Sequence, residues 1–210
     1  SEKAAIMTIE ENAEEQISNA ELKLYNIADK GNETTGFTHL VSASREAIEI
    51  ANKAYQKQGG ISGISTGLID LDKKLGGLHS SDLLIIAGRP SMGKTSLATN
   101  MAFSIANSFK TKENEDGSKT LLNGGIVGFF SLEMSSAQLA TRILSENSKV
   151  PSDKIRKGDL SEQDFRNFIE AAQSLDQCPL YIDDTAALSI SALAGRARRL
   201  KRMYGLDVLF

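Results

Sequence analysis

The chain has 210 residues, enough for one substantial domain with an appendage, and 40% of them are hydrophobic and 24% charged, as in ordinary globular proteins. Its net charge of -3 argues against a surface that coats nucleic acid, although a local basic channel stays open. The single cysteine, Cys178, excludes an internal disulfide and is expected to pack in the core. With only His39 and His79 besides, a zinc or histidine-built metal site is not expected. No apolar stretch approaches membrane-spanning length, and the start of the sequence lacks a signal-peptide pattern, so we expect a cytoplasmic protein without a membrane partner.

The first part of the chain predicts two helices and a joint. A capping box formed by Thr8 and Glu11 opens a helix over residues 8–28. A second helix, from about 38 to 57, carries an apolar stripe of Val41, Ile48, Ala51 and Tyr55. Two such helices cannot bury their stripes alone, so they should dock on the main domain, on a missing domain or on a neighbouring subunit. Residues 58–60, Gln-Gly-Gly, predict a flexible joint.

From Ile61 onward, the pattern alternates strands and helices. Four short apolar runs predict strands, at residues 83–87, 126–130, 180–182 and 206–210. Between them lie helical segments, of which one follows the first strand with apolar residues at four-residue spacing, and others start near Ser135 and Ser161. This alternation indicates an α/β fold with a parallel sheet that is covered on both faces. The polar stretch 110–125 is expected to form an exposed, mobile insertion.

A complete phosphate-binding loop pattern, G-x-x-x-x-G-K-[ST], follows the first predicted strand. It reads Gly88-Arg89-Pro90-Ser91-Met92-Gly93-Lys94-Thr95. The glycines let the backbone fold so that N–H groups face a phosphate, Lys94 supplies a positive charge, and the Thr95 hydroxyl can ligate Mg²⁺. The positive end of the following helix dipole adds to the attraction. The alternative is a tight glycine turn that binds nothing, which the strand–loop–helix setting disfavours.

The second predicted strand ends in a carboxylate, Glu133. Ligands of open parallel sheets sit beyond the carboxyl ends of the strands, so Glu133 is expected to face the same crevice as Lys94, where it can activate the attacking water. Position alone leaves this role and that of a helix-starting residue equally open. Gln138 forms a capping box with Ser135, which we favour over catalysis. Arg142 can reach either a nucleotide or a surface carboxylate.

Two further charged groups have structural and functional interpretations. Asp183 and Asp184 follow the third predicted strand and could touch Mg²⁺ through water, although helix capping or solvation is the commoner role of such residues. A basic stretch follows, with Arg196, Arg198, Arg199, Lys201 and Arg202. Its charges spread around a helix rather than along one stripe, which favours a solvated helix over one that reads DNA.

Several of these sequence segments together resemble the bacterial replicative DNA helicases of the DnaB type. The segments are residues 61–67 (Ile-Ser-Gly-Ile-Ser-Thr-Gly), Leu71-Asp72, Gly76-Gly77-Leu78, the loop 87–95, residues 130–134 (Phe-Ser-Leu-Glu-Met) with Gln138-Leu139 and Arg142, and residues 200–207. The resemblance is strong over residues 61–210 and weaker over 1–57. The conjunction of Arg-Pro-Ser-Met inside the phosphate loop with Ser-Leu-Glu-Met on the next strand is the specific part, since a generic phosphate-loop ATPase need have neither.

The resemblance implies a RecA-like ATPase core in a homohexameric ring that uses ATP and Mg²⁺ to move 5′ to 3′ along single-stranded DNA and to unwind duplex DNA at the replication fork. It also implies primase and a helicase loader as partners. Residues 1–36 then end a helical N-terminal domain, 37–60 form a linker helix and hinge, and 61–210 form the ATPase domain. Lys94 and Glu133 become catalytic residues, Thr95 a Mg²⁺ ligand and Arg142 a nucleotide-site arginine.

The sequence also departs from the family pattern. In the family, the fourth strand runs on to a Mg²⁺-supporting aspartate, DNA-binding loops and an arginine finger, whereas this sequence stops at Phe210. We therefore interpret it as a truncated piece of such a helicase and expect it to bind nucleotide poorly and to be inactive alone. Two alternatives stay open: a RecA-like regulatory or recombination ATPase without unwinding activity, and a nucleotide-binding module without turnover.

Overall fold

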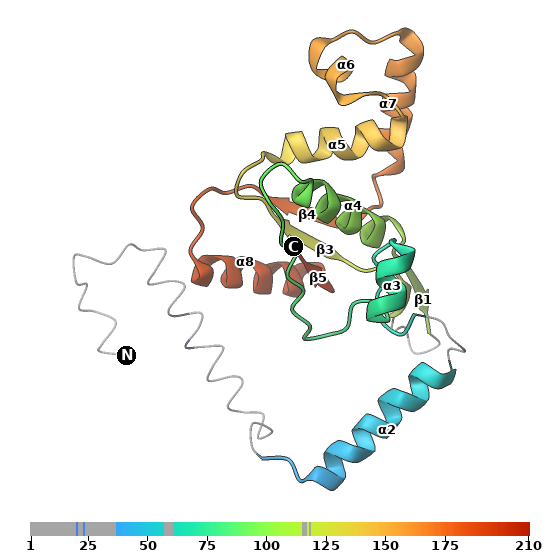
Figure 1. Cartoon of the computed structure of the whole chain (residues 1–210), viewed down its shortest axis with the longest axis vertical. Helices are drawn as coiled ribbons and strands as arrows, with labels where there is room; N and C mark the ends of the chain where they lie inside the picture. The colour runs from blue at the N-terminus through green and yellow to red at the C-terminus, as the bar shows by residue number, and fades with distance from the viewer. Residues whose placement is uncertain (1–19, 21–22, 24–36, 57–60, 115–116, 118) are drawn as a thin grey trace, which may run out of the picture.

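The structure is a computed structural model that describes residues 20, 23, 37–56, 61–114, 117 and 119–210. Its centre is a three-stranded parallel sheet of order β4-β3-β5 (Figure 1). The strands are β3 (Val127–Phe130), β4 (Leu180–Asp183) and β5 (Val208–Leu209). Val127 stands in register with Leu180 on one side and with Val208 on the other. Three of the four predicted strands and their parallel arrangement are confirmed.

Helices lie on both sides of this sheet, with α4 on one side and α8 on the other (Figure 1). The helices of this part of the fold are α4 (Lys94–Asn107), α5 (Ser136–Ser148), α6 (Ser152–Lys157), α7 (Glu162–Ser174) and α8 (Ile190–Met203). Successive residues of β3 point to opposite faces, because side chains alternate along a strand. Val127 and Phe129 belong to the core with α4 and α5. A Cβ at Gly128, between them, would lie 2.9 Å from Leu200 of α8, so the glycine allows α8 to approach closely.

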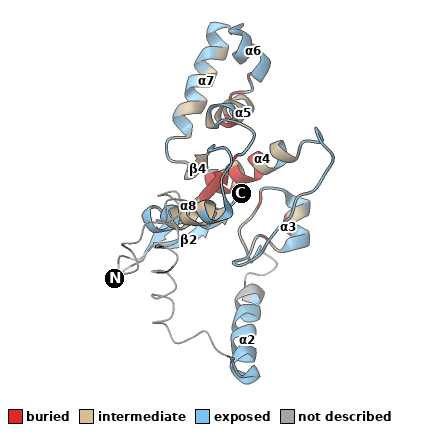
Figure 2. Ribbon diagram, turned by 90° about the vertical axis from the view of Figure 1, so that its left-hand side faces the viewer, coloured by how far each residue is buried: buried red, intermediate tan, exposed pale blue. Residues whose placement is uncertain are grey.

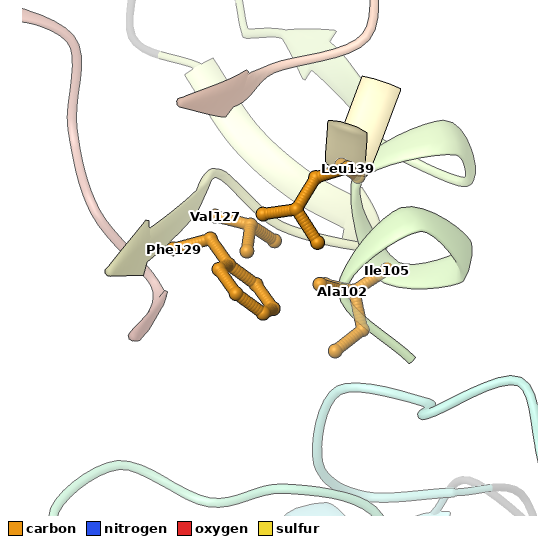
Figure 3. Close-up of a cluster of buried hydrophobic side chains, with 6 residues drawn as sticks. Ala102, Ile105, Val127, Phe129 and Leu139 are labelled. Atoms are coloured by element: carbon orange, nitrogen blue, oxygen red, sulfur yellow. The ribbon is translucent and has the colours of Figure 1, made fainter. Parts of the chain in front are cut away.

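The core lies where α4, β3 and α5 meet (Figure 3). Its buried members are Ala102, Ile105, Ala106, Val127, Phe129 and Leu139. Phe210 adds to it by stacking on Phe129 with ring centroids 5.8 Å apart. Cys178 packs against the same cluster, as predicted, and burial raises the pKa of its thiol to about 11. Removing these apolar side chains from water is the main term that holds α4 and α5 to the sheet.

The stretch 110–125 contains an antiparallel hairpin, formed by β1 (Lys110–Glu113) and β2 (Lys119–Asn123). All four β1 residues are exposed, as predicted for an insertion, but the regular pairing was not predicted. The signal was present in the sequence, since an Asp-Gly pair at 116–117 separates two segments that contain threonine. The many charges of the stretch obscured it.

The apolar run 83–87 is not a strand, which contradicts the sequence-based prediction. Leu83 and Ile85 are 86% and 77% exposed, respectively. A strand needs a hydrogen-bonding partner as well as apolar side chains, and residues 83–87 are not among the paired strands β4, β3 and β5. Hydrophobicity alone therefore does not place this segment in the sheet.

The segment before this run is closed by short-range contacts around α3 (Ile69–Leu75). Ile64 and Leu78 form an antiparallel bridge. Asp72, 3% exposed, accepts hydrogen bonds from the Ser65 hydroxyl at 2.6 Å and from the Thr66 hydroxyl and amide at 2.7 and 2.8 Å. Burial acts to raise the pKa of Asp72, but these hydrogen bonds outweigh it and hold the pKa below its usual range.

The helix predicted at 38–57 is confirmed as α2 (Leu40–Gln56). Figure 2 shows the described part of this helix as exposed, and Val41, Ile48 and Tyr55 of the predicted stripe are all exposed. The capping box of Thr8 and Glu11, most of the helix predicted at 8–28, and the joint at 58–60 lie outside the described residues. Among the residues that the structure describes, no helix is both long enough and apolar enough to span a membrane.

Candidate nucleotide-binding site

The predicted phosphate loop closes around the ammonium group of Lys94. Lys94 Nζ donates to the carbonyl oxygens of Gly88 at 2.8 Å and Arg89 at 3.2 Å. Ser91 and Gly93 have φ angles of 61° and 84°, in the left-handed region. For Ser91 this conformation is uncommon, because its side chain disfavours it. The whole loop from Gly88 to Gly93, including Pro90 and Met92, is exposed.

Helix α4 begins directly after this loop, and no side chain caps it. Its N-cap is Gly93, and no acidic residue lies in its first turn. By contrast, Ser135, Ser161 and Ser189 cap the starts of α5, α7 and α8 with their side chains. The first N–H groups of a helix have no partner within the helix and carry its positive dipole end. At α4 they are therefore available to an anion from outside the chain.

Lys94, Thr95 and Glu133 line one cavity of about 1450 Å³. Glu133 lies in the exposed loop that follows β3, next to Phe130, Ser131 and Met134, which line the same cavity. The expectation that Glu133 and Lys94 face a common crevice is thus met in the geometry. A cation, a hydroxyl and a carboxylate are the groups that gripping and hydrolysing a phosphate ester requires.

Arg142 and Gln138, both on α5, differ in their environments. Gln138 forms the predicted capping box with Ser135. The backbone N–H of Gln138 donates to Ser135 Oγ at 3.3 Å, and the side-chain oxygen of Gln138 accepts from Ser135 N at 3.0 Å. Arg142 lies outside the lining of the cavity, and its Nη1 is 3.4 Å from the hydroxyl of Ser96 in the first turn of α4. Arg142 is thus beside the loop and exposed.

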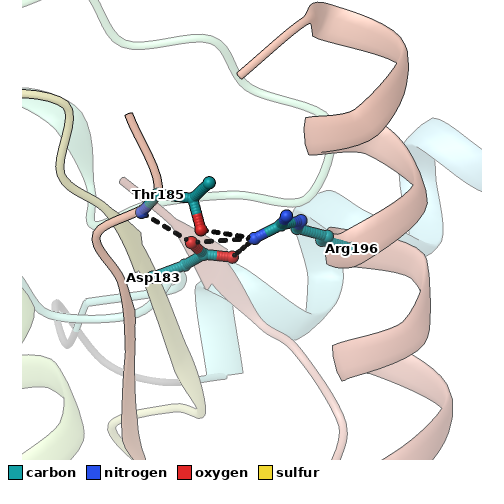
Figure 4. Close-up of polar contacts among 3 residues, drawn as sticks. All are labelled: Asp183, Thr185 and Arg196. Atoms are coloured by element: carbon teal, nitrogen blue, oxygen red, sulfur yellow. Dashed lines mark hydrogen bonds and ion pairs between the residues drawn. The ribbon is translucent and has the colours of Figure 1, made fainter. Parts of the chain in front are cut away.

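The last residue of β4, Asp183, and the residue that follows it, Asp184, hold neighbouring elements in place. Asp184 Oδ2 accepts from Ser136 N at 2.7 Å, and this backbone hydrogen bond lowers the pKa of Asp184. Asp183 pairs with Arg196 of α8 at 2.8 Å, and Arg196 also donates to the Thr185 hydroxyl at 2.6 Å (Figure 4). Partial burial acts to raise the pKa of Asp183, but the hydrogen bonds from Arg196 and Thr185 outweigh it, so the pKa is lowered.

The contact of Asp184 agrees with helix capping, one of the expected roles of these aspartates, whereas Asp183 forms an ion pair with the basic helix. Arg196, Arg199, Lys201 and Arg202 are exposed, as expected for a solvated helix, and Arg196 also forms an ion pair with Asp183 at the end of β4. No spacing rule could have identified this pair, because an irregular loop separates its two members. Within the described part of the chain, no group of three or more His, Cys, Asp or Glu side chains could hold a metal ion.

The fold and the loop define a RecA-like α/β domain that carries a phosphate-binding loop pattern. The family model of the DnaB-like helicase C-terminal domain matches residues 63–210. The chain therefore belongs to this family. The resemblance noted from the sequence is confirmed.

Proteins with known roles support the same assignment. The replicative DNA helicase DnaB of Rickettsia conorii is 46% identical over 203 residues, which are 97% of this chain and 40% of that protein. The replicative DNA helicase DnaC of Bacillus subtilis is 33% identical over 202 residues, covering 96% of this chain and 41% of its own length. The chain thus spans about two fifths of the length of these curated relatives.

Two solved structures share the fold. One, described as an ATPase domain, gives a TM-score of 0.65 at 23% identity, over 79% of this chain and 55% of the other. A DnaB-like replicative helicase, described with its interactions with primase, gives a TM-score of 0.63 at 22% identity, over 92% of this chain and 42% of the other. At these identities the likeness shows the RecA-like fold, not the function.

Proposed function

We propose that this chain is the ATP-hydrolysing part of a replicative DNA helicase. The observation that carries the proposal is the cavity that Lys94, Thr95 and Glu133 all line, beside a helix start that no side chain caps. The alternatives are a RecA-like regulatory or recombination ATPase and a nucleotide-binding module without turnover. The family membership and the names of the relatives favour the helicase over both.

The residues of the site divide the work of ATP hydrolysis between them. The backbone of residues 88–93 and the first turn of α4 hold the phosphates, and Lys94 exchanges its two carbonyl partners for phosphate oxygens. Glu133 orients a water molecule and accepts its proton as the water attacks the γ-phosphorus and the bond to the leaving ADP breaks. Arg142 lies outside the cavity lining, and in this proposal its guanidinium leaves the hydroxyl of Ser96 to contact the nucleotide. Mg²⁺, when bound, neutralises charge on the phosphates, and the Thr95 hydroxyl would hold it.

The assembly follows from the same proposal. The working form is a homohexameric ring that encloses single-stranded DNA and moves 5′ to 3′, with primase and a helicase loader as partners, in the cytoplasm. Residues 1–36, 37–60 and 61–210 then serve as the end of an N-terminal domain, a linker with its hinge, and the ATPase domain. The exposed apolar stripe of α2 fits a linker helix that docks on another subunit.

The test is Glu133→Gln in the whole protein, with Glu170→Gln on the exposed surface of α7 as the matched control. We expect Glu133→Gln to lower kcat for ATP about 10²–10⁴-fold, because the amide cannot accept the proton. The Kd of a fluorescent ATP analogue should stay within about twofold, since the phosphate grip is intact. A fork with a 5′ single-stranded tail should be unwound by the control and not by Glu133→Gln.

Two results would contradict the proposal. Wild-type turnover in Glu133→Gln would remove the carboxylate from the reaction. Normal turnover at saturating ATP together with a large loss of affinity would make Glu133 a structural residue. Full ATPase activity without unwinding of either a 5′-tailed or a 3′-tailed fork, in the unmutated protein, would instead favour the regulatory ATPase.

A further inference from the structure

We propose that Ser131 is a positioning residue for Glu133, an inference that rests on the proposed ATPase function. Ser131 follows β3 directly and is 6% exposed. Its hydroxyl donates to the carbonyl oxygen of Met134 at 2.6 Å and accepts from the amide of Met134 at 3.2 Å. One buried hydroxyl thus bonds both backbone groups of the residue three positions ahead and closes a ring around Leu132 and Glu133.

The ring is fixed to the sheet at its beginning. Ser131 N donates to the carbonyl oxygen of Asp183 at 2.8 Å, which continues the pairing with β4. Phe130 N donates to the carbonyl oxygen of Phe210 at 2.8 Å on the other side. The backbone is therefore held from both neighbouring strands up to the residue whose hydroxyl forms the ring.

The far end of the loop is fixed as well. Ser135 caps α5 through its capping box with Gln138, and Ser136 N donates to Asp184. Between these two anchors only Leu132 and Glu133 have exposed side chains, with Leu132 61% exposed. The backbone of this short loop thus fixes the point from which the exposed Glu133 side chain extends toward the cavity that it lines.

Positioning at this level matters for a general base. A displacement of about 1 Å of a reacting group can cost about 10²-fold in rate, whereas binding by groups elsewhere is unaffected. Loss of the Ser131 hydroxyl would leave the Met134 amide and carbonyl without their partner and free the loop to move. The effect should therefore fall on kcat and not on ATP affinity.

The test compares Ser131→Ala with Ser145→Ala in the whole protein. Ser145, on α5, also donates from a half-buried hydroxyl to a backbone carbonyl, that of Val150 at 2.5 Å, but it lies outside the cavity lining. We expect Ser131→Ala to lower kcat about 10- to 100-fold and to leave the Kd of a fluorescent ATP analogue within about twofold. Ser145→Ala should lower the thermal unfolding temperature about as much as Ser131→Ala does, but should leave kcat unchanged.

Ser131→Cys keeps the volume of the side chain and weakens its hydrogen bonds, so it tests the inference even where Ser131→Ala does not fold. Wild-type kcat in either folded variant overturns the positioning role. An equal loss of kcat in Ser131→Ala and Ser145→Ala also overturns the positioning role, because the cause is then general destabilisation. Glu133→Gln, measured in parallel, separates the two proposals: its inactivity together with a fully active Ser131→Ala refutes this inference alone, whereas an active Glu133→Gln refutes both.

Discussion

Helices α4 and α5 pack against one another at the core, yet their first turns are completed in opposite ways. Helix α5 satisfies its own start: Ser135 and Gln138 form a capping box, and the Asp184 carboxylate accepts from Ser136 N. Helix α4 begins at Gly93, in a left-handed conformation and with no capping side chain. A negative charge stabilises the N-terminus of either helix, but only α5 carries its own.

This difference indicates that the N-termini of α4 and α5 have different roles. At α5 the chain itself provides acceptors for the backbone N–H groups of Ser136 and Gln138, so this start is part of the scaffold that holds the loop of Glu133. At α4 the partners are left for a ligand, and Lys94 is occupied meanwhile by two backbone carbonyls. Substitutions at the start of α4 should therefore change ligand binding, whereas those at the start of α5 should change stability.

The largest effect is expected for Lys94→Ala. It removes the only side-chain cation found among the cavity-lining residues of the loop, so kcat/KM for ATP should fall about 10²–10³-fold or more. ATPase assays on the whole protein would measure this. Lys157→Ala, which removes an exposed ion pair with Asp153 on α6, is the control and should change little. Unchanged ATPase activity in Lys94→Ala would show that the loop is only a turn.

A smaller effect is expected for Gly93→Ala. An added Cβ meets no atom within 4 Å, but the φ of 84° strains any L side chain by about 1–2 kcal/mol. Gly158→Ala is the matched control, because Gly158 has a φ of 72°, equally open space, and a place at the end of α6 far from the loop. Both variants should lose similar stability in urea unfolding. Only Gly93→Ala should weaken ATP binding. If Gly93→Ala and Gly158→Ala bind ATP equally well, the start of α4 is not the ligand-binding one of the two helix starts.

Local signals in the sequence were sufficient to predict much of this difference between the N-termini of α4 and α5. The phosphate loop pattern, the capping box of Ser135 and Gln138, and the strand before Glu133 all depend on residues a few positions apart. Such patterns are set by backbone geometry that neighbours dictate. The presence of Glu133 in the lining of the same cavity as Lys94 was also predicted, because ligands of parallel sheets sit beyond the carboxyl ends of the strands.

What could not be predicted depends on distant partners. Residues 83–87 have the composition of a buried strand, but a strand also needs a pairing partner, which composition does not supply. The ion pair of Asp183 with Arg196 and the capping of α5 by Asp184 join segments whose approach only the fold determines. The ring formed by Ser131 was within reach of the sequence, as a serine three residues before its partner, but nothing in the pattern required that geometry.

Ser135→Ala should lower the stability of the chain and leave its affinity for ATP unchanged. Loss of an N-cap serine side chain costs about 1 kcal/mol of stability. The other half of the capping box, from the backbone N–H of Ser135 to the Gln138 side chain, does not need the serine hydroxyl. Ser161→Ala removes the equivalent capping box of α7 and is the matched control. Urea unfolding of the 210-residue chain should show similar losses for both, with the Kd of an ATP analogue unchanged. A weakened affinity in Ser135→Ala but not in Ser161→Ala would mean that the start of α5 belongs to the ligand site.

The smallest effect is expected for Asp184→Asn, and it should depend on pH. The hydrogen bond from Ser136 N lowers the pKa of Asp184 below its ordinary value of 3.8. A carboxylate whose pKa is lowered by folding stabilises the protein fully above that ordinary value, and this stabilisation is lost as the pH falls through the lower, folded-state pKa. The side-chain amide that this substitution introduces would still accept the hydrogen bond but carry no charge toward the helix start. Urea unfolding at a series of pH values from about 6 to about 3 should therefore show a small loss for Asp184→Asn that shrinks below pH 3.8. A loss that is constant across the series would assign the effect to packing and remove the charge of Asp184 from the cap of α5.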